Sequence, residues 1–204
     1  MAWDRAAAAR LRPDASWPVL RRALAPLGAV LLAGPAAAGP DMARDRDDWE
    51  IFCGRCLMPD GRVVDTGNRG VSHSEGQGTG LLFAARFDDR ARFERILAWT
   101  RGALARPGDM LHAWRFRPGA AIPVDDPNNA TDGDLLIAWG LALAHARWGV
   151  AEHRRLSAAI AGDVLRLCTL THAGRRVLLP GAYGFRHPDH LVLNLSHYLH
   201  GAFD

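Results

Sequence analysis

The chain has 204 residues, of which 49% are hydrophobic and 23% are charged. This length allows one domain with its own hydrophobic core, and the composition excludes a disordered chain. The net charge of +3 arises within the first 38 residues, because residues 39–204 contain equal numbers of acidic and basic side chains. The sequence therefore gives no electrostatic reason to expect a nucleic-acid partner.

Residues 1–38 have the features of an export signal. Arg21 and Arg22 precede an apolar run over residues 23–33, and three alanines follow at 36–38. This order predicts a signal peptide removed near Ala38, with a short buried or amphipathic helix as the alternative. The apolar run is too short for a permanent anchor. We therefore expect a mature domain of residues 39–204 that is periplasmic or secreted, without stable membrane insertion.

Helices dominate the rest of the chain. Apolar residues recur at helical spacing over residues 41–58, 74–87, 130–148 and 151–171, and over a further segment that starts at a cap on Asp88 or Asp89 and ends before Arg106. Residues 130–148 are apolar on nearly all sides, whereas the flanking helices are amphipathic, which predicts inner and outer helical layers. One short hairpin is expected over residues 177–185, broken by Pro180-Gly181.

The stretches between the helices include candidate functional loops. Residues 66–74 are polar and glycine-rich, and residues 110–129 are irregular and contain Trp114. Such segments usually lie at a surface or a cleft. The helices that follow them are expected to begin with capping boxes, formed by Ser74 with Gln77 and by Thr131 with Asp134.

Cysteine and histidine spacings favour no metal site. Cys53 and Cys56 have the spacing of a redox or half-zinc motif, but no second pair completes four ligands. Two small residues packed near a helix end are the preferred interpretation, with a local disulfide as the alternative. Four further histidines form a loose cluster without matching carboxylates: His187, His190, His197 and His200.

Glu75 and Asp132 each fall in the first turn of an expected helix. The helix dipole favours ionised carboxylates there, whereas a general acid needs a raised pKa. If the two side chains share a cleft, the charge of Asp132 would raise the pKa of Glu75. The alternative is that both acids only stabilise helix ends. Gly76 and Gly133 beside the acids favour a site, because they let a ligand approach the backbone closely.

Four blocks of sequence carry a resemblance to a known family. They are residues 71–78 (VSHSEGQG), 98–100 (AWT), 112–114 (HAW) and 128–139 (NNATDGDLLIAW). In order and spacing, from about Trp49 to Phe203, they resemble glycoside hydrolase family 8. Within this family they are most similar to the periplasmic cellulases that accompany bacterial cellulose synthases.

The resemblance implies an all-α fold, an incomplete α/α-toroid of the six-hairpin glycosidase type, and an inverting endo-β-1,4-glucanase without a cofactor. Glu75 matches the proton donor, Asp132 matches the aspartate that distorts the sugar at the cleavage point, and Asp134 matches a structural position. Trp114 and Gln77 are the candidate substrate-binding residues. Trp114 suits stacking on a glucose ring, with core packing as the alternative. The implied partners are a cellulose chain and the cellulose synthase machinery.

The general base is not found among these blocks. In the family it lies in a later helix, within a Tyr-Asp-Ala-type motif that this sequence lacks, and His197 stands in a stretch otherwise rich in tyrosine. We therefore expect a catalytic domain truncated at its C-terminus. The alternatives are a non-hydrolytic glucan-binding relic, a helical scaffold without glucan binding, and an enzyme acting on xylan or chitosan.

Overall fold

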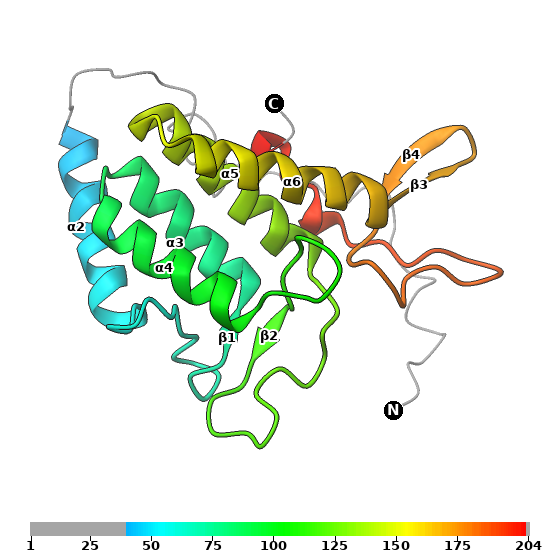
Figure 1. The fold of residues 1–204 in the computed structure, drawn as a ribbon, viewed down its shortest axis with the longest axis horizontal. Helices are drawn as coiled ribbons and strands as arrows, with labels where there is room; N and C mark the ends of the chain where they lie inside the picture. Colours follow the sequence, from blue (N-terminus) through cyan, green and yellow to red (C-terminus); the bar gives the residue numbers. More distant parts are fainter. Residues whose placement is uncertain (1–39, 203–204) are drawn as a thin grey trace, which may run out of the picture. The chain divides into compact units, whose positions relative to one another are not determined.

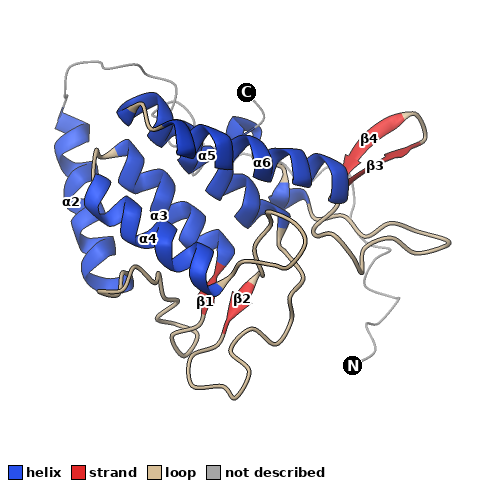
Figure 2. Ribbon diagram, viewed as in Figure 1, coloured by secondary structure: helices blue, strands red, loops and turns tan. Residues whose placement is uncertain are grey.

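The computed structural model describes residues 40–202 (Figure 1). The leader expected over residues 1–38 lies outside this range. Helices dominate the described chain, as the sequence predicts, and the strands are short (Figure 2). The helices are α2 (Pro40–Cys56), α3 (Ser74–Arg86), α4 (Arg90–Ala103), α5 (Thr131–Trp148) and α6 (Ala151–Leu167), with 3-10 turns η1 (Leu195–His197) and η2 (His200–Ala202). The strands are β1 (Ser72–His73), β2 (Arg115–Phe116), β3 (Thr169–His172) and β4 (Arg175–Leu178). No helix in the described range is long and apolar enough to cross a membrane.

The helices form layers around the pair α3 and α5. These two helices pack on each other, α4 packs on α3, and α6 packs on α5 (Figure 1). The amphipathic helix α6 buries one stripe at helical spacing, whose apolar members are Leu156, Ile160 and Val164. In α5 the buried residues spread over several faces. The amphipathic helices therefore cover the more apolar ones.

Glycines allow α3 and α5 to approach closely. A Cβ atom added at Gly78 would lie 2.6 Å from the Cβ of Leu136, and one at Gly133 would lie 2.8 Å from the backbone nitrogen of Glu75 and collide with Ser74. Gly133 was expected to leave room for a ligand, and this interpretation was wrong. The missing side chain leaves room for the first turn of α3, which brings the two helix starts together.

The other end of α3 is anchored on α2. Trp49 is 2% exposed and its ring lies 6.3 Å from that of Phe87, centroid to centroid. The indole nitrogen of Trp49 donates a hydrogen bond to Asp89, 3.2 Å away. Asp89 also caps α4 by accepting from the backbone nitrogen of Arg92 at 3.1 Å, so this predicted cap is confirmed. These contacts fix α2 and α4 relative to α3.

The hairpin does not lie where the sequence analysis predicts it. It spans β3 and β4, with Thr169 opposite Leu178, and its turn contains Ala173 and Gly174, both with positive φ. The Pro180-Gly181 pair is not a hairpin turn. The carbonyl of Pro180 instead accepts a hydrogen bond from the backbone nitrogen of Thr131 at 2.9 Å. This segment therefore packs against the start of α5.

Neither expected capping box forms. His73 and Ala130 are the residues that precede α3 and α5, and neither caps its helix with a side chain. The hydroxyl of Thr131 donates instead to the carbonyl of Leu179 at 2.7 Å. Long-range partners have thus replaced the local hydrogen bonds that the sequence pattern favours.

Candidate active site

Glu75 lies in the first turn of α3 and borders a cavity of about 280 Å³. The cavity combines apolar walls with polar groups, a common property of ligand sites. Its lining consists of Phe52, Val63, Val64, Asp65, His73, Glu75, Gly76 and Thr79. Glu75 itself is exposed, so its carboxylate is accessible to a ligand.

Strands β1 and β2 hold the loop that carries Trp114 against the start of α3. His73 pairs with Arg115 in this short antiparallel ladder, and the backbone nitrogen of Ser74 donates to the carbonyl of Trp114 at 3.1 Å. The His73 ring is stacked on the Trp114 ring, with centroids 5.9 Å apart. The predicted substrate-binding residue Trp114 therefore lies close to Glu75.

The Trp114 side chain is half-buried and held by two charged neighbours. Its indole nitrogen donates to Asp126 at 2.9 Å, and the guanidinium of Arg115 lies 4.3 Å from the centre of its ring. Arg115 is in turn paired with Asp125 at 3.2 Å. These contacts fix the orientation of the indole, and a cation over the ring covers part of its stacking surface.

Asp132 lies at the start of α5, opposite the start of α3. One oxygen of its carboxylate accepts from the backbone nitrogen of Gly133 at 2.8 Å. The other lies 3.4 Å from Nε2 of His197, which η1 brings to this point, and the Asp132 side chain is 14% exposed. A Cβ atom added at Gly133 would lie 2.8 Å from the backbone nitrogen of Glu75, and the charge of Asp132 acts on Glu75, so the two predicted carboxylates are neighbours.

The pKa of Glu75 is raised. Partial burial, which removes water from the carboxylate, is the main cause, and the negative charge of Asp132 adds to it, whereas His73 and His197 act in the opposite direction. Burial and a like charge both favour the protonated form of a carboxyl group. Glu75 can therefore carry a proton at a higher pH than an ordinary glutamate, as expected for two carboxylates in one cleft.

Gln77 does not face the site, so its assignment as a substrate-binding residue was wrong. Its side chain is fully buried, and its amide bonds to three groups of the chain itself. It accepts from the backbone nitrogen of Val63 and donates to the hydroxyl of Thr100 at 2.8 Å and to the carbonyl of Gly61 at 3.3 Å. Gln77 anchors the loop that forms one wall of the cavity.

Comparisons with known proteins identify the family. The family model described as "Glycosyl hydrolases family 8" matches residues 18–204. The chain belongs to glycosyl hydrolase family 8. It is 46% identical over 178 residues to a probable endoglucanase of Novacetimonas hansenii, an alignment that covers 86% of this chain and 52% of that protein. It is 43% identical over 155 residues to an endoglucanase of Cellulomonas uda, covering 76% of this chain and 43% of that protein.

Solved structures of family 8 agree with this fold. An endoglucanase of this family from Klebsiella pneumoniae superposes with a TM-score of 0.76 at 43% identity, over 77% of this chain and 51% of that one. An endo-β-1,4-glucanase from Acetobacter xylinum gives 0.74 at 49% identity, over 76% and 49%. The expected fold class, an incomplete α/α-toroid, is confirmed. The chain spans about half the length of the relatives that it matches.

Asp134 supports the candidate site from within the core. It is fully buried and accepts from the backbone nitrogen of His112 at 3.0 Å and from the side chain of Asn129 at 3.0 Å, while Nδ1 of His112 lies 2.9 Å away. Burial raises the pKa of Asp134, against the effect of these partners. The network ties the start of α5 to the loop that carries Trp114.

The histidines of the expected loose cluster do not form a metal site. His187 and His190 stack on each other with centroids 4.4 Å apart, whereas His197 contacts Asp132. Across residues 40–202 no group of three or more histidine, cysteine, aspartate or glutamate side chains is arranged to hold a metal ion. Cys53 is buried and Cys56 is half-buried, and both are free thiols.

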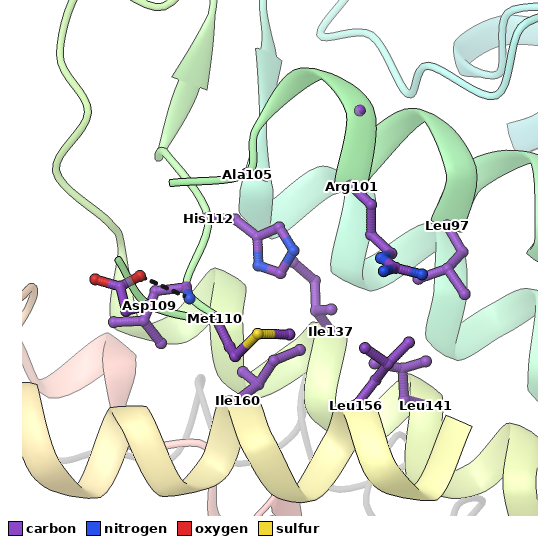
Figure 3. Close-up of a pocket in the computed structure, with 12 residues that line it drawn as sticks. Leu97, Arg101, Ala105, Asp109, Met110, His112, Ile137, Leu141, Leu156 and Ile160 are labelled. Atoms are coloured by element: carbon purple, nitrogen blue, oxygen red, sulfur yellow. Dashed lines mark hydrogen bonds between the residues drawn. The ribbon is translucent and has the colours of Figure 1, made fainter. Parts of the chain in front are cut away.

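A larger cavity of about 420 Å³ lies between α4, α5 and α6 (Figure 3). Its walls are mostly aliphatic, with Arg101, Asp109 and His112 as the polar members (Figure 3). Glu75 does not line it, and Asp132 lines neither of the two cavities. The candidate site is therefore placed at the smaller cavity, which Glu75 lines at the start of α3.

Proposed function

We propose that this chain carries the proton-donor side of an endo-β-1,4-glucanase site, which acts on cellulose or a related β-glucan in the periplasm or outside the cell. The observation that carries this proposal is the pairing of Glu75, whose pKa is raised, with Asp132 at the adjoining starts of α3 and α5. The relatives named endoglucanases support the same reaction class.

Glu75 has the properties that a glycosidase acid requires. Hydrolysis of a glycosidic bond needs a carboxylic acid that protonates the leaving oxygen as the bond to the anomeric carbon breaks. A raised pKa keeps the proton on Glu75 toward neutral pH. After transfer the carboxylate is left next to Asp132, a pairing that favours reprotonation from water before the next cycle.

Asp132 and Trp114 would position the sugar. In this proposal the Asp132 carboxylate accepts hydrogen bonds from hydroxyl groups of the glucose unit at the cleavage point. The exposed part of the Trp114 indole offers apolar surface to the adjoining ring. Both side chains have partners in the chain, Asp126 for Trp114 and His197 for Asp132, which limits the entropy lost when a glucan binds.

An inverting reaction also needs a general base. The base carboxylate stands roughly 6.5–9.5 Å from the acid and activates water on the opposite face of the sugar. Asp132 sits beside Glu75 and contacts His197, so it suits holding the sugar better than holding that water. We therefore assign the base to no residue of this chain, and this favours glucan binding without hydrolysis as the second candidate function.

The place of this reaction in the cell is also part of the proposal. An exported β-glucanase of this family would trim glucan chains as they leave the cell, beside the cellulose synthase machinery. This proposal rests on the export signal expected over residues 1–38 and on the similarity to endoglucanases.

Reducing-end release from carboxymethyl cellulose tests the reaction. The purified chain is compared with Glu75→Gln and with Glu152→Gln, a change at an exposed ion pair on α6. Release that is lost in Glu75→Gln and kept in Glu152→Gln supports the proposal. If the wild type releases nothing, calorimetric titration with cellohexaose separates a glucan-binding protein from one that does not bind glucan.

A further inference from the structure

His197 lies in the candidate site although it follows Asp132 by 65 positions in the sequence. The turn η1 packs on α5, and Nε2 of His197 lies 3.4 Å from the Asp132 carboxylate. His197 is 8% exposed. Its backbone is fixed on both sides, since its nitrogen donates to Asn194 at 3.2 Å and its carbonyl accepts from Leu199 at 3.1 Å.

The second ring nitrogen of His197 has different surroundings. Nδ1 is buried and has no hydrogen-bond partner among the described residues. A neutral imidazole carries its proton on only one nitrogen, and a buried N–H without an acceptor is costly. The tautomer with the proton on Nε2 places an N–H group 3.4 Å from the Asp132 carboxylate and leaves Nδ1 as a bare nitrogen. The position of the ring beside Asp132 therefore favours the Nε2–H tautomer.

Asp132 depends on this donor to keep one orientation. The hydrogen bond of its carboxylate is accepted from the backbone nitrogen of Gly133, the adjacent residue, and involves only one oxygen. A bond to the neighbouring residue restrains the side chain weakly, because it moves with the same backbone. The contact with His197 is the long-range restraint on the second oxygen.

We propose that His197 is a positioning residue for Asp132, which donates from Nε2 to the carboxylate and sets the rotamer in which Asp132 meets the sugar. This inference rests on the proposed function, in which Asp132 holds the glucose unit at the cleavage point.

Two variants separate positioning from packing. His197→Gln keeps an N–H donor near the place of Nε2, whereas His197→Phe keeps a ring of similar size without a donor. If His197 only fills space, His197→Phe should resemble the wild type more closely than His197→Gln does. If His197 positions Asp132, His197→Gln should resemble the wild type more closely.

Nuclear magnetic resonance gives a readout that needs no activity. Long-range nitrogen spectra of the wild type should show the His197 proton on Nε2, and three-bond couplings should show one Asp132 χ1 rotamer. The rotamer should become averaged in His197→Phe and stay single in His197→Gln. A wild-type proton on Nδ1, or an unchanged Asp132 rotamer in a folded His197→Phe chain, overturns the proposal.

Glucan binding tests the consequence for the site. An Asp132 carboxylate that is no longer held in one rotamer loses hydrogen bonding to the sugar, and a hydrogen bond to a charged group is worth roughly tenfold in affinity or more. His197→Phe should therefore bind cellohexaose at least about tenfold more weakly than the wild type. His197→Gln should recover part of this loss, and Asp132→Asn with His197→Phe should bind no more weakly than Asp132→Asn alone. If the wild type binds no glucan, the proposed function fails, while the tautomer and rotamer measurements still decide the role of His197.

Discussion

The surroundings of Glu75 act on its pKa in opposite directions. A helix start stabilises a carboxylate, and the nearby histidines do the same, yet the pKa of Glu75 is raised. Partial loss of water around the carboxylate and the charge of Asp132 therefore outweigh the favourable position. The charge of Asp132 acts on Glu75 because the starts of α3 and α5 meet.

The pKa of Glu75 should fall when Asp132 is replaced by asparagine. Removing a nearby negative charge favours ionisation of the remaining carboxyl group, so Glu75 loses its proton at lower pH than in the wild type. Because the acid works only when protonated, any glucanase activity should begin to fall at a lower pH than in the wild type as the pH is raised. Titration of the Glu75 side-chain carbon by nuclear magnetic resonance measures the shift without requiring turnover.

The matched control for this titration is Asp65→Asn. Asp65 lines the same cavity, but its charge is not a cause of the raised pKa. The control should leave the titration of Glu75 unchanged. A Glu75 midpoint that stays at its wild-type value in Asp132→Asn would show that the two carboxylates do not interact.

Local motifs predicted some site residues and failed for others. Glu75, Asp132 and Trp114 stand in distinctive blocks, and the structure brings all three together. Gln77 belongs to the same block as Glu75 but points into the core, because two positions along a helix turn a side chain by about 200°. His197 gave no local signal, since its partner lies 65 positions earlier.

The contact between α3 and α5 depends on residues without side chains. Gly78, Gly133 and Gly140 each face the backbone or the Cβ of the opposite helix. Glycine destabilises a helix relative to alanine, so its use at these positions is explained by close packing rather than by helix propensity. The spacing of the two helices in turn sets the distance between Glu75 and Asp132.

Gly133→Ala should destabilise the fold by about 1–3 kcal/mol, because the added Cβ collides with Ser74 and lies 2.8 Å from the backbone nitrogen of Glu75. Gly162→Ala in α6 is the control. Nothing lies within 4 Å of a Cβ there, so the change should stabilise the fold by about 0.5–1 kcal/mol. Urea unfolding monitored by circular dichroism gives both values. Equal effects of the two changes would contradict a packing role for Gly133.

Helix positions were predicted well because they follow from apolar periodicity and from the capping and turn residues at the helix ends. The hairpin was misplaced because Pro180-Gly181 looks like a turn, whereas the true turn includes Ala173 at a φ of 48°, a conformation that alanine rarely adopts. The two capping boxes were mispredicted for a related reason. The Thr131 hydroxyl found a partner 48 positions away, which no local pattern reveals.

At the scale of the whole molecule, the described residues contain a well-formed core and an exposed apolar segment. Leu195 is 71% exposed, Leu193 45% and Val192 39%, all just before or within η1. Clustered exposed apolar side chains promote association, so we expect copies of the chain to associate through this segment.

Leu193→Ser with Leu195→Ser should reduce self-association of the purified chain without loss of stability. Both side chains already contact water, so their replacement should change the free energy of unfolding by less than about 0.5 kcal/mol. Leu156→Ala is the contrasting change, because Leu156 is 2% exposed and its truncation should cost about 2–5 kcal/mol. Sedimentation velocity over a range of concentrations measures association, and thermal unfolding measures stability. Unchanged association in the double variant would mean that copies of the chain meet through another surface.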